Sequence, residues 1–281
     1  MNRIIKTTIF TLVILFSVSA AAQSAQSTLG AQLAELNSLK DKIKSADTRT
    51  RVDAFHQAWF IAENSDDTNV KMLALDLMKE PVGSASDHIR MPAVYAIAEI
   101  ASSTTDVSVK SKALSTLKDP VSSGQLPIRV AAVDAVNTIF CSPDAASLAL
   151  DAVQLLGDSV RSGNNGIRIP AINAVAHIAI ASKDDRAFSA AIDLMQGPLD
   201  SIAMIGGMEV RMMAVVEVER LGMYAPEIPT KAKAMGMLQA CAHNNSWEPE
   251  AQRRAAAGAA QIQNSMKPAP PSDRQLPKSQ T

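Results

Sequence analysis

The sequence is poor in aromatic residues and cysteine, and it has no excess of charge of either sign. Aromatic side chains make up 4% of the 281 residues, and 27 basic side chains stand against 28 acidic ones. Nucleic-acid-binding proteins usually carry a strongly basic surface, so this balance argues against a nucleic-acid partner. Cys141 and Cys241 are the two cysteines, and two cannot form a disulfide framework or a multi-cysteine zinc site.

One hydrophobic run stands out, at residues 9–16. It follows Arg3 and Lys6 and precedes a row of alanines ending at Ala22. A basic start, a short apolar stretch and a small-residue exit are the three parts of a secretory signal peptide. The run is shorter than the roughly 20 residues that a membrane-spanning helix needs. We therefore expect residues 1–22 to be cleaved near Ala22, leaving a periplasmic or secreted chain with no membrane insertion.

The rest of the chain contains an arginine at a nearly fixed spacing. The spacing is 39 residues between the first four copies and 43 before the fifth: Arg51, Arg90, Arg129, Arg168 and Arg211. A weaker sixth copy begins at Arg254, again after 43 residues. We number positions by their offset, the count of residues after the repeat arginine. Offset three is alanine in the first five copies, and apolar residues at offsets three, four, seven and ten form one face of a helix.

A second amphipathic helix precedes each arginine, so each repeat is a pair of helices. Neither helix can bury its apolar stripe alone, and successive pairs should therefore stack into a solenoid. We predict an all-α fold, an α-solenoid of six helix pairs with a period of 39–43 residues within residues 23–263. The pairs are expected at about 28–62, 66–101, 105–140, 144–179, 184–222 and 228–263. Pro92 and Pro170 are expected in the first turn of their helices, where a missing N–H costs little.

Paired helices with an arginine near the start of the second one resemble the HEAT-repeat family, over roughly residues 28–263. The acid that often accompanies that arginine in the family is present only sporadically, as Asp47 and Asp87. The recurrent arginines are assigned a structural role. Residues 264–281 carry four prolines and two large apolar residues, a composition typical of a disordered tail.

The resemblance implies that the second helix of each pair lines a concave surface where partners bind. Helical geometry places offsets five, eight and nine away from the apolar stripe. Candidate binding residues at these offsets are His56, Trp59, Phe60, Tyr95, Glu99, Asp134, Asn137, Asn173, His177 and Arg220. The aromatic members could instead cover a partly open first repeat, and the polar members could be an ordinary solvated face.

A second candidate binding site is the insertion in the fifth repeat, where apolar residues replace a polar turn. Its candidate residues are Ile202, Met204 and Ile205. Met204, Met208 and Met212 are spaced four apart, but packing explains them better than copper binding.

Sequence motifs for catalysis and for cofactor binding are missing. The chain has no Gly-x-Ser-x-Gly elbow, phosphate-binding glycine loop or dinucleotide fingerprint, and no His-x-x-x-His pair. We therefore expect no metal and no cofactor.

These observations favour an exported, non-catalytic scaffold that binds an envelope or secreted protein or peptide, and we expect it to be a monomer. Two alternatives stay open. One is a HEAT-like enzyme, of lyase or modifying type, with Glu99, Asp134 and His177 as acid or base. The other is a self-assembling structural protein.

Overall fold

The computed structural model describes residues 28–141, 143–200 and 207–267. Within these ranges the chain is helical with short connections and has no strand. The proposed signal peptide, the three loop candidates of the fifth repeat and residues 268–281 lie outside them. The chain divides into two compact units between Ile139 and Phe140, and each unit is described separately.

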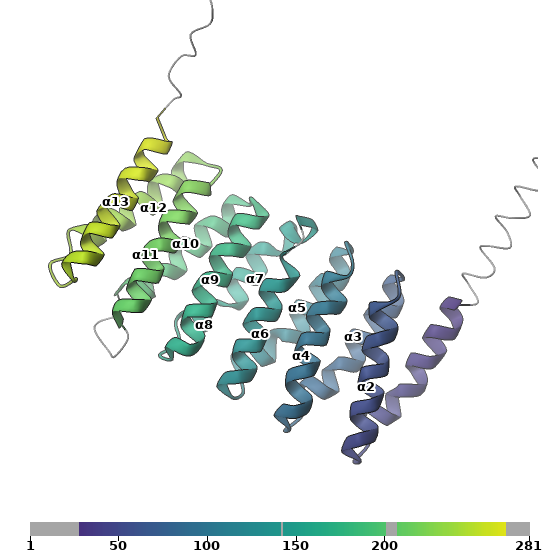
Figure 1. Cartoon of the computed structure of the whole chain (residues 1–281). Coiled ribbons are helices and arrows are strands. Elements are labelled where there is room, and N and C mark those ends of the chain that lie inside the picture. The colour runs from purple at the N-terminus through teal and green to yellow at the C-terminus, as the bar shows by residue number, and fades with distance from the viewer. Residues whose placement is uncertain (1–27, 142, 201–206, 268–281) are drawn as a thin grey trace, which may run out of the picture. The chain divides into compact units, whose positions relative to one another are not determined.

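The first unit contains three helix pairs. Residues 28–43 form the first helix, and the others are α2 (Thr48–Glu63), α3 (Thr68–Val82), α4 (Asp87–Ser102), α5 (Val107–Ser122) and α6 (Leu126–Ile139). The second helices of the pairs, α2, α4 and α6, lie side by side in one layer, and α3 and α5 pack behind them (Figure 1).

The second unit also contains three pairs. Its elements are η1 (Pro143–Leu148), α7 (Ala149–Leu155), α8 (Gly157–Val160), α9 (Asn165–Ser182), α10 (Asp185–Asp200), α11 (Gly207–Tyr224), α12 (Ile228–Ala242) and α13 (Pro249–Ser265). Helices α9, α11 and α13 form the layer of second helices, while α7, α8, α10 and α12 form the other (Figure 1). The predicted all-α solenoid of six helix pairs is confirmed.

The first helix of the fourth pair is broken into η1, α7 and α8, and its sequence explains why. Asp67 and Asp106 cap α3 and α5, and their carboxylates accept hydrogen bonds from the first-turn N–H groups. The corresponding residue of the fourth pair is Ala145, which offers no acceptor. Gly157, a poor helix former, stands at the second break.

The alanines at offset three belong to the core. All five are at most 2% exposed: Ala54, Ala93, Ala132, Ala171 and Ala214. The large apolar residues that follow them at offset four are buried as well, from Phe55 to Val215. A small and a large side chain in succession therefore define the core of every regular pair.

Two of the repeat arginines, Arg90 and Arg129, donate hydrogen bonds to backbone carbonyls at the C-terminal ends of first helices. Arg90 Nε donates to the carbonyl of Val82 at 2.9 Å, and its Nη2 donates to that of Ser123 at 3.2 Å. Arg129 Nε donates in the same way to Val121, at 3.2 Å. Gly124 makes room for Arg90, because a Cβ at this position would lie 2.7 Å from Arg90 Nη1. Its φ of 111° also disfavours any residue other than glycine. The arginines thus satisfy carbonyls that a helix end leaves free.

The other repeat arginines have different partners. Arg168 donates to the carbonyl of Ser162, and Arg211 pairs with Glu248. Arg51 Nε is buried without a hydrogen-bond partner among the described residues.

Two details of the predicted register are wrong. Pro92 and Pro170 are each the sixth residue of their helix, not in the first turn, because α4 and α9 begin earlier than expected. Each proline leaves the carbonyl four residues before it without its helical N–H partner. In the sixth copy the buried residues Gly258, Ala259 and Ile262 match offsets three, four and seven from position 255. That copy therefore starts one residue after Arg254.

Helix α13 continues to Ser265, so the first two residues of the predicted tail are helical. Among the described helices, none is long and apolar enough to cross a lipid bilayer.

Candidate functional site

The outward face of the second helices is narrower than the sequence predicts. Offset five is exposed in α2, α4, α6 and α9, and offset nine is exposed in α2, α4, α6 and α11. Offset eight was expected to be exposed too, but Ala98, Ala176 and Glu219 are buried there. Offsets six and eight point sideways, toward the neighbouring second helices of the same layer. The outward face therefore consists of offsets five and nine, with offset eight at its edge.

Four aromatic side chains gather on this face in the first unit. We call them the aromatic ridge: His56, Trp59 and Phe60 on α2, and Tyr95 on α4. Phe60 is 65% exposed and Tyr95 is 44% exposed, whereas Trp59 is partly buried. The His56 and Trp59 rings pack with their centroids 5.9 Å apart. The structure thus brings the predicted aromatic candidates onto two adjacent helices.

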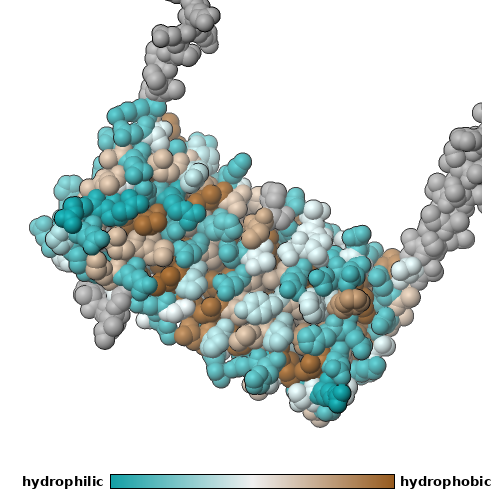
Figure 2. All heavy atoms as spheres, viewed as in Figure 1, coloured by the Kyte–Doolittle hydropathy of each residue, from teal (hydrophilic) through white to brown (hydrophobic). Residues whose placement is uncertain are grey.

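A shallow hollow of about 350 Å³ lies beside the ridge. It is lined by Glu35, His56, Gln57, Trp59, Phe60 and Ile61. Seen from the side of the second helices, hydrophobic residues form small separate patches among hydrophilic ones (Figure 2). A partner that binds this face would therefore contact a few separate apolar side chains and not one continuous hydrophobic surface.

Carboxylates accompany the ridge. Glu99, the exposed offset-nine residue of α4, has a pKa raised by partial desolvation and by the nearby carboxylate of Glu63, while the Trp59 indole N–H opposes the rise. Trp59 Nε1 is itself buried without a hydrogen-bond partner at bonding distance in the described chain. Sequence reasoning missed Glu63, although offset twelve points in the same direction as offsets five and nine. Two acids therefore lie close to the aromatic ridge.

Helix α6 extends this face with polar residues. Asp134 is exposed at offset five, and contact with its surroundings raises the pKa of its carboxyl by partial desolvation. Asn137, at offset eight, is half-buried. The face of the first unit thus changes from aromatic on α2 to polar on α6.

In the second unit the candidate residues lie on α9 and α11. Asn173 is exposed and His177 is half-buried on α9, while Arg220 is exposed on α11. Arg220 Nη1 donates to both carboxylate oxygens of Glu217, at 2.9 and 2.7 Å. Burial raises the pKa of Glu217, and Arg220 opposes the rise. The charge of Arg220 is therefore already partnered within its own helix.

The proposed acid and base residues do not all belong to one unit. Glu99 and Asp134 are in the first unit, and His177 is in the second. Within the described ranges, no group of three or more histidine, cysteine, aspartate or glutamate side chains could hold a metal ion.

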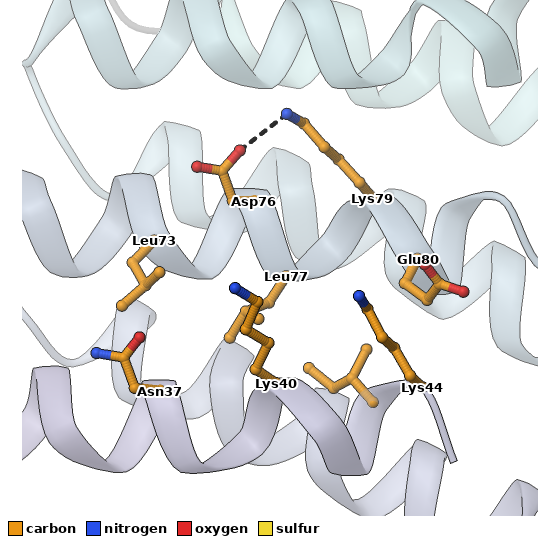
Figure 3. A pocket seen from close by; sticks show the side chains of 9 residues that line it. Asn37, Lys40, Lys44, Leu73, Asp76, Leu77, Lys79 and Glu80 are labelled. Atoms are coloured by element: carbon orange, nitrogen blue, oxygen red, sulfur yellow. Dashed lines mark ion pairs between the residues drawn. The ribbon is translucent and has the colours of Figure 1, made fainter. Parts of the chain in front are cut away.

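A second hollow, of about 370 Å³, lies in the other helix layer of the first unit. Its lining residues are Asn37, Lys40, Ile43, Lys44, Leu73, Asp76, Leu77, Lys79 and Glu80. Figure 3 shows Lys40 and Lys44 extending from the 28–43 helix toward α3, whose Leu73 and Leu77 point back toward that helix. Asp76 pairs with both Lys79, at 2.8 Å, and Lys112, at 2.6 Å. Lysines and acids alternate in its lining, and Asp76 is already paired. This hollow is therefore a weaker candidate binding site than the aromatic ridge.

Comparisons with known proteins concern the fold. No protein-family model and no curated protein matches the chain. An engineered protein of known crystal structure is 19% identical, with a TM-score of 0.50 over 82% of this chain and 97% of that one. The archaeal HEAT-like repeats protein from Thermococcus onnurineus NA1 is 14% identical, with a TM-score of 0.50 over 85% of this chain and 94% of its own. The resemblance to HEAT repeats is thus confirmed at the level of the fold.

Proposed function

We propose that the protein is a non-catalytic scaffold that binds a protein or peptide segment on the outward face of its second helices. The aromatic ridge is the observation that carries this proposal. Trp59, Phe60 and Tyr95 are three of the ten aromatic residues of the chain, yet they share one face of two adjacent helices. Exposed aromatic side chains are frequent anchors of binding energy, and stacked repeats often present an extended binding surface.

A catalytic function is less well supported. Partial desolvation and the Glu63 carboxylate explain the raised pKa of Glu99, so it needs no role in proton transfer. A self-assembling role predicts an oligomer, whereas the scaffold proposal expects a monomer. Measuring the mass in solution separates these two possibilities.

The test is capture of a partner by the chain without its proposed signal peptide, residues 23–281, from a cross-linked envelope extract. The informative variant is the double substitution Phe60→Ala and Tyr95→Ala, because both side chains are exposed and their removal should preserve the fold. The matched control is Tyr224→Ala with Ile228→Ala, which removes side chains that are 65% and 64% exposed elsewhere.

We expect the ridge variant to lower the recovery of specific partners by about tenfold or more, as loss of two binding anchors should. The control variant should recover them normally, and both variants should keep the helicity and melting temperature of the parent. Equal recovery by the ridge variant would show that the partner binds elsewhere.

Export is part of the proposal and rests on residues 1–22. An N-terminal sequence beginning after Ala22 in protein recovered from the envelope fraction would support it. Intact residues 1–22 in the cytoplasmic fraction would contradict it.

A further inference from the structure

We infer that the aromatic ridge, together with Glu63 and Glu99, forms a subsite for a basic side chain, lysine or arginine, of the bound peptide segment. This inference rests on the proposed function and adds the chemistry of the partner. The expected ligand is a lysine or arginine in an extended or helical segment of another protein.

The positions of the side chains support a cation subsite. Offsets five, nine and twelve point the same way on α2, which places His56, Phe60 and Glu63 along one line. Tyr95 and Glu99 form the matching line on α4, which packs beside α2 in the same layer. Aromatic rings and carboxylates thus share one surface, and both attract a lysine or arginine side chain.

None of the ion pairs between the described residues includes Glu63 or Glu99. Lys71 is near enough to interact electrostatically with Glu63, but its buried Nζ donates to the Ala62 carbonyl at 3.0 Å and to Ser103 Oγ at 2.6 Å. An arriving cation would therefore meet two carboxylates that repel each other.

The second unit provides an internal contrast. Its exposed residue at offset nine of α11 is Arg220, and Glu217 already neutralises that charge. The corresponding residue of α4 is Glu99, which forms no ion pair with another described residue. The difference favours the first unit as the place where a basic segment binds.

A segment of a protein fits better than a small free cation. The hollow beside the ridge is shallow, and Phe60 and Tyr95 stand exposed at its side. On α6 of the same unit, Asp134 and Asn137 continue the polar face, where a longer ligand could form further hydrogen bonds.

The test uses the indole N–H signals of residues 23–281 in a nitrogen–proton correlation spectrum. The chain has two tryptophans, so Trp59 reports on the subsite and Trp247, in the second unit, serves as an internal control. A Trp247→Phe variant assigns the two signals. The probes are two nonapeptides of alanine and serine that differ at the central residue, which is arginine in one and its neutral isostere citrulline in the other.

We expect the arginine peptide to shift the Trp59 signal saturably and to leave Trp247 unchanged. Affinity should fall about fivefold or more with citrulline, and by a similar factor for Glu99→Gln, because each change removes a charge-assisted contact. Glu80→Gln, which changes the net charge equally on a different helix, should bind as the parent does.

Two results would overturn the inference: no Trp59 shift up to about 10 mM arginine peptide, the weak end of measurable affinity, or equal binding of both peptides. The capture experiment keeps this failure distinct from failure of the proposed function. If the Phe60→Ala/Tyr95→Ala variant loses its partner while Glu99→Gln retains it, the scaffold proposal stands and the basic subsite does not.

Discussion

The two units bury charged side chains at different points of the same repeat. Among the described residues of the first unit, the buried charges are Lys71 and Lys110, at equivalent positions of the first helices α3 and α5. In the second unit they are Arg211, Glu217 and Glu219, all on the second helix α11. Offsets six and eight, where α4 has Ala96 and Ala98, thus carry two glutamates in α11.

Offset eight can hold either a small apolar residue, as in α4, or a buried carboxylate, as in α11. Glu219 is 7% exposed and its carboxylate pairs with Arg254 of α13 at 2.5 Å. Gly258 gives it space, because a Cβ there would lie 3.1 Å from Glu219 Oε2. An alanine at offset eight needs no such arrangement. A buried charge is therefore tolerated where the neighbouring helix supplies both an opposite charge and room.

The largest effect is expected from removing the partner of a buried charge. Arg254→Met leaves the Glu219 carboxylate buried without its cation. We expect the free energy of unfolding to fall by about 2–3 kcal/mol, toward the low end for a broken buried pair because Arg254 is partly exposed. Urea unfolding of the parent and the variant measures the loss.

The control is the double variant Glu219→Ala with Arg254→Met, which restores the alanine found at this offset in α4 and α9. It should recover most of the stability, since neither charge then remains buried alone. A double variant as unstable as Arg254→Met would show that Arg254 acts by packing and not by its charge.

A smaller loss should follow from overfilling the contact between helices in either unit. Ala132→Leu and Ala214→Leu both add bulk at offset three, where the alanines are fully buried. We expect each to lower the free energy of unfolding by about 1–3 kcal/mol. Thr138→Leu, on the exposed side of α6, should change it by no more than about 0.5 kcal/mol. Equal stabilities of Ala132→Leu and Thr138→Leu would contradict the packing of α6.

The sequence predicts the helix pairs well because the spacing of apolar residues along a helix follows from helical geometry alone. Apolar residues at offsets three, four, seven and ten must share a face, so the burial of Ala132 and Val133 follows from geometry alone. The burial of Ala98 and Ala176 does not follow from it. That burial depends on how closely the next second helix packs, which no residue of the same helix reveals.

The candidate site was predicted in part. Phe60, Tyr95 and Glu99 were expected to be exposed and are exposed, because offsets five and nine lie opposite the core. Glu63 was missed although its offset is equivalent. Glu63 and Glu99 lie on two different helices, and their electrostatic interaction becomes apparent only when α2 and α4 are placed side by side.

The smallest effect concerns a helix cap that the two units do not share. Asp106 caps α5: its Oδ1 accepts from Ser108 N at 2.8 Å, and its Oδ2 accepts from Thr68 Oγ1 at 2.6 Å. The hydroxyl of Ser108 also donates to Oδ1, at 2.6 Å, and this hydrogen bond, with those from Thr68 and Ser108 N, lowers the pKa of Asp106 from 3.8 to about 2. In the second unit Ala145 stands at the equivalent position, and no regular helix starts there. Asp106→Ala should therefore lower the free energy of unfolding by about 1 kcal/mol near neutral pH.

The pH dependence of this loss follows from the lowered pKa. The carboxylate contributes fully above the unfolded-state pKa of 3.8, and its contribution disappears as the pH falls through about 2. Urea unfolding at pH 7, 4 and 2.5 should therefore show the difference between the parent and Asp106→Ala shrinking between pH 4 and pH 2.5. Asp119→Ala, an exposed aspartate of α5 outside the cap, should show little difference from the parent at neutral pH. A difference between the parent and Asp106→Ala that stays constant with pH would mean that the charged carboxylate is not what stabilises the start of α5.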